Sequence, residues 1–411
     1  MVELKHLRYL DLNNNAFNSV PIPAFLGSLK ELSNNAFIGV PIPAFLSSLK
    51  ELGYLDLSNA RFSGRIPQNL LVELKHLHHL DLSNNAFNGV LIPAFLGSLK
   101  ELRYLDLSNA GFSGRIPQNL VNLSYLSTLD ISNNSLTGLI PASLGGFSLP
   151  RYLSLSHNRL NGLIPINLRH LSNLHFLDIS YNSLTGNQIN GTIPLSIGEM
   201  TSLFVLDLSR NKISGTIPSS LGNCVGLEAL DLSRNHLSGV IPKSLENNFS
   251  GNIPAWIGNS FHSLRILRLR SNKFIGKIPQ QILNLTSLRV LDAAHNYLSG
   301  SMPQGLENLI GMKNEQMTNY ILHYGGAIQG HYYEENLIMS MKGLVFNYSK
   351  TISLLTCIDL SSNHLSGKIP EVLTNLLGLL GLNLSGNNFT GKFLDKVGRL
   401  ALLESLDFSR N

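Results

Sequence analysis

The sequence predicts a repeat solenoid of the α/β type, in which short parallel strands form one continuous sheet on a concave face. Two observations carry this prediction. A unit of about 24 residues recurs from end to end of the 411-residue chain, and Asn, Gly and Pro keep fixed offsets within it. That length alone would suggest two or three globular domains, but stacked repeats bury one continuous core instead.

Each part of the unit L-x-x-L-x-x-L-x-L-S-x-N-x-L-S-G-x-I-P has a structural reason, as in LTSLRVLDAAHNYLSGSMP at 285–303. The x-L-x-L alternation predicts a short strand with its leucines turned inward. The Asn, for example Asn134, is expected to satisfy backbone groups where the strand ends. The Gly permits a bend, and the Ile-Pro step favours extended backbone on the far side. The pattern therefore predicts a leucine-rich-repeat right-handed superhelix with its parallel sheet on the concave face.

Interruptions of the repeat divide the chain into three parts. Leucine-rich repeats fill 1–308, an insertion that we call the island fills 309–351, and further repeats, which end inside a unit, fill 352–411. The island is rich in Tyr, Met, Gly and His, and this composition argues for a structured segment. Residues are lost or added at three places, where we expect irregular stacking: 32–36, 186–193 and 245–250.

Composition and motifs exclude several classes of function. The net charge is +5, but Lys and Arg are scattered, which makes nucleic-acid binding a weak hypothesis. Cys224 and Cys357 are too few for a disulfide framework or a zinc site, and no apolar run of 18 residues would span a membrane. No hydrolase, nucleotide-binding, metalloprotease or kinase motif is present. We therefore expect no enzyme activity, no cofactor and no metal.

One outward column of the predicted sheet is almost entirely aspartate. These residues could be read as a ladder that binds cations, or as acceptors of local hydrogen bonds. Because identical residues in every coil indicate architecture, we favour local hydrogen bonds. The column comprises Asp11, Asp56, Asp81, Asp106, Asp130, Asp178, Asp207, Asp231, Asp292, Asp359 and Asp407.

Variable outward positions are better candidates for binding. In the N-terminal half they form a basic and aromatic column, whose residue types often supply binding energy at interfaces. A solvated sheet face without a partner remains the alternative. The column contains Arg8, Tyr9, Tyr54, His78, His79, Arg103, Tyr104, Arg151, Tyr152, His175 and Phe176, and we select His79, Arg103, Tyr104 and Tyr152 as ligand contacts.

A second candidate is an arginine cluster before the island, where Arg268 stands at the position that is otherwise aspartate. We expect these outward positions to be exposed and to form a ligand or co-receptor surface with island residues. The arginines are Arg265, Arg268, Arg270 and Arg289, and the island residues are Tyr320, His323, Tyr324, His331, Tyr332 and Tyr333.

Eight Asn-x-Ser/Thr sequences are candidate glycosylation sites, which would agree with secretion. Repeats rich in Asn and Ser also produce such sequences by chance. The acceptors are Asn122, Asn133, Asn190, Asn248, Asn284, Asn347, Asn383 and Asn388.

The L-x-G-x-I-P spacer resembles the plant-specific leucine-rich repeat of cell-surface receptors. The segment KGLVFNYSKTISLLTCIDLSSNHLSGKIPEVLTNLLGLLGLNLS at 342–385 is similar to the C-terminal ectodomain of plant receptor-like proteins. LKHLRYLDLNNNAFNSVPIPAFLGSLKEL at 4–32 resembles the N-terminal repeats of the same group, which is related to the ethylene-inducing-xylanase receptors.

This resemblance implies an ectodomain fragment that recognises a secreted protein or peptide, possibly microbial in origin, in plant defence. Signalling would then pass through a separate co-receptor kinase. It also implies a place on the extracellular face of the plasma membrane as part of a longer receptor, or secretion into the apoplast if the chain is complete. The family's signal peptide, cysteine caps and membrane anchor have no counterpart in these 411 residues.

Two other functions remain open at this point. One is a soluble inhibitor similar to polygalacturonase-inhibiting proteins, which would have about ten regular repeats between cysteine caps. The other is an ice-binding solenoid, which would need a flat column of Thr or similar small residues. The chain shows more repeats, an island and no such column, so receptor recognition is the preferred interpretation. The ligand itself cannot be read from one sequence.

Overall fold

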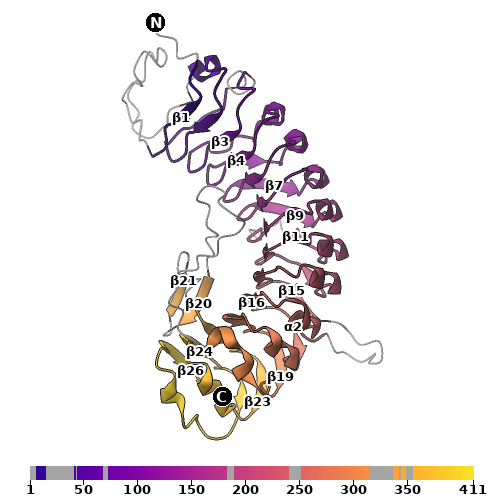
Figure 1. Cartoon of the computed structure of the whole chain (residues 1–411), viewed down its shortest axis with the longest axis vertical. Helices are drawn as coiled ribbons and strands as arrows, with labels where there is room; N and C mark the ends of the chain where they lie inside the picture. Colours follow the sequence, from indigo (N-terminus) through magenta and orange to yellow (C-terminus); the bar gives the residue numbers. More distant parts are fainter. Residues whose placement is uncertain are drawn as a thin grey trace. The chain divides into compact units, whose positions relative to one another are not determined.

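The structure is a computed structural model of the chain, and its described residues are 6–14, 41–42, 44–67, 73–182, 189–239, 251–313, 337–341, 344–348 and 355–411. They fall into two compact units, unit 1 within residues 1–190 and unit 2 within 191–411 (Figure 1). The irregular segments expected at 32–36 and 245–250 lie outside the described residues, as do part of 186–193 and most of the island.

A parallel sheet of three-residue strands runs through unit 1, with equivalent positions of successive repeats side by side. Leu55, for example, pairs with Leu80, which pairs with Leu105. The predicted leucine-rich-repeat sheet is therefore confirmed. Its strands are β1 (Tyr9–Asp11), β2 (Tyr54–Asp56), β3 (His79–Asp81), β4 (Tyr104–Asp106), β6 (Thr128–Asp130), β8 (Tyr152–Ser154) and β10 (Phe176–Asp178). We call the surface made by their outward side chains the strand face.

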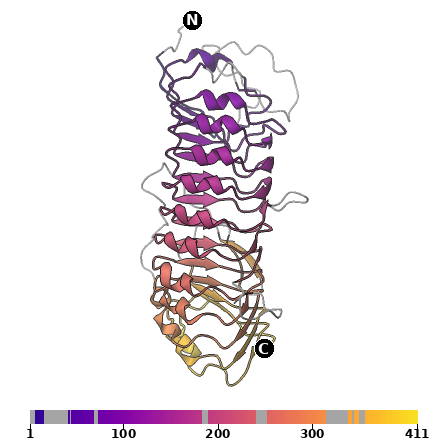
Figure 2. The ribbon, with the colours of Figure 1, turned by 90° about the vertical axis from the view of Figure 1, so that its right-hand side faces the viewer.

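The rest of each coil in unit 1 forms a second small sheet and a short 3-10 helix after the Ile-Pro step. The helices stack one upon another, as Figure 2 shows. The second sheet contains β5 (Ser113–Gly114), β7 (Ser135–Leu139), β9 (Arg159–Leu163) and β11 (Ile189–Asn190). The helices are η2 (Ala44–Ser48), η3 (Ala94–Ser98), η4 (Gln118–Asn122), η5 (Ala142–Gly146) and η6 (Ile166–His170).

Unit 2 repeats this architecture. Its parallel sheet contains β12 (Val205–Asp207), β14 (Ala229–Asp231), β16 (Ile266–Arg268), β18 (Val290–Asp292), β22 (Cys357–Asp359), β24 (Gly381–Asn383) and β26 (Ser405–Asp407). The short outer strands are β13 (Ser214–Gly215), β15 (His236–Leu237), β17 (Ile275–Gly276), β19 (Tyr297–Gly300), β23 (His364–Gly367) and β25 (Asn388–Phe389). The helices are η7 (Leu195–Glu199), η8 (Ser219–Asn223), α2 (Trp256–Ser260), η9 (Gln280–Asn284), η10 (Leu306–Asn308), η11 (Ile310–Met312), η13 (Glu371–Asn375) and η14 (Val397–Arg399).

Interruptions in the sequence leave the register of the main sheets intact. β18 pairs directly with β22, so Val290 lies beside Cys357 although the island separates them in the chain. Likewise β14 pairs with β16, and β1 pairs with β2. Within the island, β20 (Leu337–Met341) and β21 (Leu344–Tyr348) form an antiparallel hairpin. The strands that flank each interruption are therefore neighbours in the sheet.

The inward asparagine of each repeat ties neighbouring coils together, as expected from its place after the strand. Nδ2 of Asn134 donates to the carbonyls of Ile131 and Ser132 in its own coil and to Leu107 in the preceding one, at 2.8–3.1 Å. Its Oδ1 accepts from the Phe112 amide at 2.9 Å. Buried backbone groups that a strand end leaves unpaired are thereby satisfied. Equivalent bonds recur at Asn158, Asn182, Asn235, Asn272, Asn296, Asn363 and Asn387.

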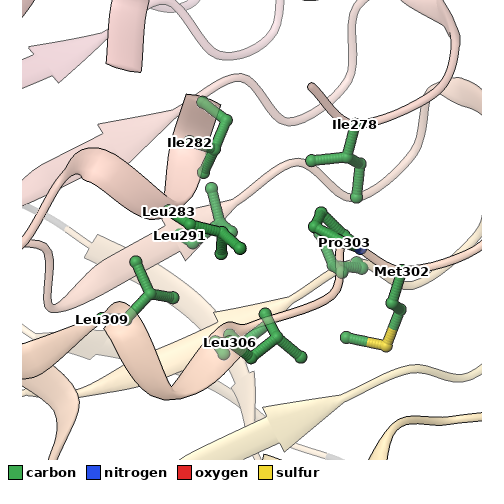
Figure 3. Close-up of a pocket in the computed structure, with 10 residues that line it drawn as sticks. Ile278, Ile282, Leu283, Leu291, Met302, Pro303, Leu306 and Leu309 are labelled. Carbon is green, nitrogen blue, oxygen red and sulfur yellow. The ribbon is translucent and has the colours of Figure 1, made fainter. Parts of the chain in front are cut away.

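A small apolar cavity lies in the core of unit 2, where the repeats on either side of the island meet (Figure 3). Its volume of about 10 Å³ matches roughly one water molecule. The lining, which includes Leu291, Met302, Leu306 and Ile358, offers no polar side chain to hold that water. We interpret the cavity as a packing gap and not as a ligand site.

Candidate functional site

The outward aspartates bond to their own coils, which supports the architectural interpretation of this column. Oδ1 of Asp106 accepts a hydrogen bond from the amide of Ser108, two residues on, at 2.8 Å. The same bond closes the turn after most of the strands that end in aspartate, and it holds the carboxylate beside the sheet. It recurs at Asp56, Asp81, Asp130, Asp178, Asp207, Asp231, Asp359 and Asp407.

Aromatic rings stack along the strand face of unit 1. Tyr9, Tyr54, His79 and Tyr104 form a continuous ladder with ring centroids 4.0–4.2 Å apart and interplanar angles of 7–12°. Their spacing follows the roughly 4.8 Å separation of neighbouring strands. His79 and Tyr104 are each only 7% exposed; rings cover both faces of His79 and one face of Tyr104. These two predicted ligand contacts therefore offer a partner mainly their edges.

The ladder has a one-strand gap at Thr128. Tyr152 closes it by leaning from β8 toward β6, where its hydroxyl donates to Oδ2 of Asp130 at 3.2 Å. Phe176 stacks behind Tyr152 with a centroid separation of 4.3 Å. Thr128 is consequently only 1% exposed, and its buried hydroxyl has no hydrogen-bond partner among the described residues. The predicted contact Tyr152 thus also supports the sheet.

Two carboxyl groups of unit 1, those of Asp81 and Asp130, have raised pKa values. Burial, followed by the charge of Asp106, raises the pKa of Asp81 to about 7. Burial likewise raises the pKa of Asp130 to about 6, although bonds from Ser132 oppose the change. Burial and neighbouring carboxylates raise the pKa of Tyr104 well above its ordinary value, so its phenol remains a neutral donor. The ladder of unit 1 contains no cation to offset its aspartates.

The basic residues beside the ladder are more accessible. His78, Arg103 and Arg151 are exposed, whereas His175 is half-buried. They occupy one repeat position, because the Arg103 amide bonds to the His78 carbonyl and the His175 amide bonds to the Arg151 carbonyl. Burial and then the charge of Arg151 lower the pKa of His175. Arg8, Arg103 and Arg151 are the exposed arginines among the candidate residues of unit 1.

The arginine cluster of unit 2 behaves differently. Arg268 forms an ion pair with Asp231 on the neighbouring strand. Arg270 donates through Nε to both carboxylate oxygens of Asp292, at 2.8 and 3.0 Å, and through Nη2 to Asp359. Both aspartates paired with Arg270 are fully buried. Burial by itself would lower the pKa of Arg270, but the two carboxylates outweigh it and raise that pKa.

The expectation that this cluster is exposed is wrong for three of its members. Arg268, Arg270 and Arg289 are only 6–7% exposed, since arginine stems lie along the sheet and two of the guanidinium groups reach in-register aspartates. Arg265 is half-buried and lies 3.9 Å from Glu228. Burial and then the charge of Arg265 lower the pKa of Arg289 to about 10. A contact of these arginines with a ligand stays a prediction.

Other predicted sites divide into described and undescribed positions. Tyr324, His331 and Tyr332 lie outside the described residues, as does Asn248, and the side chain of Asn347 is not described. The acceptors Asn122, Asn133, Asn190, Asn284 and Asn388 are exposed. Asn383 is half-buried, and its Oδ1 accepts from the amide and hydroxyl of Ser385 in place of the usual aspartate.

The described ranges contain neither a metal-binding cluster nor a membrane-spanning helix. There, no three His, Cys, Asp or Glu side chains come together in a way that could hold a metal ion. None of the helices in that part of the chain combines the length and apolar character that a membrane span requires. Cys224 and Cys357 are buried, and burial raises the pKa of the Cys224 thiol to about 11.

Family models for the leucine-rich repeat match this chain at 100–160, 124–184 and 183–237, and at 6–29, 76–99, 263–285, 287–309 and 354–376. Together the matched segments cover more than half of the sequence. The chain belongs to the leucine-rich-repeat family. Part of the chain is similar to curated plant proteins that are named as receptor-like proteins.

Receptor-like protein EIX2 of Solanum lycopersicum is 42% identical to this leucine-rich-repeat protein over 140 residues, which are 33% of the chain and 14% of the relative. The match thus spans about one seventh of that protein's length. The crystal structure of the Arabidopsis receptor kinase HAESA with the peptide hormone IDA and the co-receptor SERK1 has a TM-score of 0.59 and 27% identity, covering 98% of this chain and 66% of the other. A TDR receptor structure has a TM-score of 0.68 at 24% identity, covers 98% of this chain and 60% of the other, and shows the shared fold.

Sequence reasoning missed two features of this chain. It did not anticipate that Arg268 and Arg270 pair with aspartates, although the in-register aspartate column offered that signal. It also passed over Thr128, where the aromatic column skips one repeat. In both cases the informative signal was a residue that broke a column, read together with its neighbours on adjacent strands.

Proposed function

We propose that this chain is the ligand-recognition part of a plant cell-surface receptor-like protein that acts in pathogen perception and signals through a separate receptor kinase. The observation that carries the proposal is that structural and variable positions are separate within each coil. The repeated Leu, Asn and Asp side chains form the core and the hydrogen bonds of the fold, while the remaining outward side chains differ from coil to coil. A rigid parallel sheet with variable outward side chains suits recognition of an extended partner.

The comparisons support this proposal at a general level. Relatives of the chain are named as receptor-like proteins, and a structurally similar ectodomain was solved with a peptide hormone and a co-receptor. We propose the same classes of partner here, namely a secreted protein or peptide and a co-receptor kinase. The role would be binding and not catalysis. Placement outside the cell, with glycans on the exposed acceptors such as Asn122 and Asn284, belongs to the same proposal.

A plant expression experiment tests this function. The chain would be secreted from leaf tissue, purified, and examined for saturable binding to individually purified microbial secreted proteins. A binder should also increase the association of the chain's parent receptor with a receptor kinase in co-precipitation. Mass spectrometry of the same preparation should find glycans on exposed acceptors. Absence of saturable binding together with an absence of glycans would contradict the proposal.

A further inference from the structure

A basic column crosses the strand face of unit 1 beside the aromatic ladder. It runs through His78, Arg103, Ser127, Arg151 and His175, because each residue's amide bonds to the preceding member's carbonyl at 2.8–2.9 Å. One strand separates Arg103 from Arg151. With neighbouring strands roughly 4.8 Å apart, their backbones lie about 10 Å from each other. Two guanidinium groups therefore stand at a fixed spacing on a rigid support.

The charges of Arg103 and Arg151 are not neutralised by carboxylates of the described residues. Arg103 and Arg151 are exposed, and across the described ranges no carboxylate lies within ion-pair distance of either guanidinium. The nearby aspartates of the strand face are already engaged. Asp106 accepts from Ser108 and Tyr104, and Asp130 accepts from Ser132 and Tyr152. Unlike the paired arginines of unit 2, this pair retains its capacity to bind an anion.

The geometry favours a peptide over an anionic sugar chain. Sugar rings dock on open aromatic faces, but stacking covers both faces of His79 and one face of Tyr104, and each residue is only 7% exposed. Guanidinium groups bind carboxylates in a bidentate manner. In a polyproline II segment, which has three residues per turn, acidic side chains three residues apart point to the same side and lie about 9 Å apart, close to the arginine spacing.

We propose that the strand face of unit 1 binds an acidic peptide segment in the polyproline II conformation, with Arg103 and Arg151 each holding one carboxylate of a pair three residues apart. This inference rests on the proposed function and names the chemical class of the ligand. The aromatic ladder supplies the wall along which the segment lies. Ser127, between the two arginines, offers a hydroxyl to the peptide backbone.

The test uses the full chain and a fluorescein-labelled twelve-residue Gly-Ser peptide that carries two Glu three residues apart. Fluorescence anisotropy measures its Kd. The double variant Arg103→Gln/Arg151→Gln should weaken binding at least about tenfold, as expected from the loss of two charge-assisted contacts. The matched control is Arg115→Gln/Arg159→Gln, which removes two exposed arginines of the same unit that lie away from the strand face. It should remain within about twofold of the parent chain.

Further probes make the test decisive. A peptide with adjacent Glu residues and one with Gln in place of Glu should both bind more weakly than the spaced peptide. Equal binding of all three peptides, equal weakening by the control variant, or tighter binding of tetragalacturonate than of the spaced peptide would overturn the proposal. Circular dichroism confirms that each variant is folded. If a microbial ligand binds the Arg103/Arg151 variant with unchanged affinity, this inference fails while the receptor function stands. If the spaced peptide binds as predicted but no microbial protein binds the chain, the inference stands while the proposed receptor function fails.

Discussion

The strand faces of the two units solve one electrostatic problem in different ways. Both carry a column of outward aspartates that close the turns after their strands. In unit 2, Arg268 and Arg270 enter the same face and pair with Asp231, Asp292 and Asp359. In the described part of unit 1 no arginine or lysine enters the column, and aromatic rings stack beside it. Burial raises the pKa of Asp81 to about 7 and that of Asp130 to about 6, and in unit 2 it raises the pKa of Asp359 to about 6 although Arg270 opposes the change.

This difference teaches where free charge remains. In unit 2, Arg268 and Arg270 form ion pairs with aspartates of the same sheet. A cluster that is basic in sequence is therefore close to electrically neutral in the structure. In unit 1 the aspartates are satisfied by serine amides and tyrosine hydroxyls, and the flanking arginines stay available. A count of charges along the sequence would rank the two regions in the opposite order.

Removal of Arg270 should produce the largest effect. Arg270→Met leaves Asp292 and Asp359 buried without a counter-charge, which should lower the free energy of unfolding by about 3–5 kcal/mol at neutral pH. Urea denaturation followed by circular dichroism measures the loss. Arg234→Met, at an exposed arginine of the same unit, should change the stability by less than about 0.5 kcal/mol. Equal losses in the two variants would refute the structural role of Arg270.

The inward asparagines should contribute equally to the stability of both units. Asn158→Ala in unit 1 and Asn235→Ala in unit 2 each remove a buried side chain with bonds to two coils. Each should cost about 2–4 kcal/mol because buried backbone groups lose their partners. Denaturant titration of the two variants should give losses that agree closely. A large loss of stability in only one of the two variants would show that the inward asparagines do not stabilise both units equally.

Stability of unit 1 should fall as pH rises. The pKa of Asp81 is about 7 and that of Asp130 about 6 in the folded chain, both above the usual value near 4. The stabilisation is therefore complete below pH 4 and is lost as pH rises through 6 and 7. Between pH 5 and pH 8 the unfolding free energy should decrease by about 2–4 kcal/mol. Thermal denaturation across this range measures it.

Asp81→Asn is the matched variant for the pH experiment, because Asn383 already occupies the same repeat position in unit 2 and accepts the same serine amide. The variant should flatten the pH dependence while preserving the fold. If the unmodified chain instead became more stable from pH 5 to pH 8, the raised pKa values of Asp81 and Asp130 would be contradicted.

The smallest effect is expected at the gap in the aromatic ladder. The Thr128 hydroxyl is buried without a partner, so Thr128→Val should raise the free energy of unfolding by about 1 kcal/mol. Thr128→Ser keeps the hydroxyl and serves as the control, which should not stabilise the chain. Differential scanning calorimetry resolves a change of this size. A destabilised valine variant would reveal a role for the hydroxyl that the structure does not show.

Most of the fold could be predicted from the sequence because one physical pattern repeats. Leucines at alternate positions, an inward asparagine and a glycine after it determine each coil nearly independently of the others. The inward bonds of Asn134 and the parallel pairing of Leu55 with Leu80 follow from that pattern. Even the damaged repeats leave strand pairing intact, since β1 pairs with β2 and β18 pairs with β22.

The candidate site was less predictable because it depends on contacts between coils. Arg268 looks like an exposed charge in one dimension, and only its register with Asp231 shows that the charge is paired. The exposure of Arg103, by contrast, follows from a neighbour such as Ser127 that offers no carboxylate. Sequence identifies which positions vary, whereas register decides which of them remain available to a ligand.

Hydrogen–deuterium exchange of the full chain, with and without the spaced acidic peptide, tests the central comparison most directly. The account predicts slower exchange of backbone amides in β3, β4, β6 and β8 of unit 1, with β16 and β18 of unit 2 unchanged. Protection of β16 and β18 in place of the unit 1 strands would show that the buried arginines of unit 2 are the ones that bind, and would contradict the account.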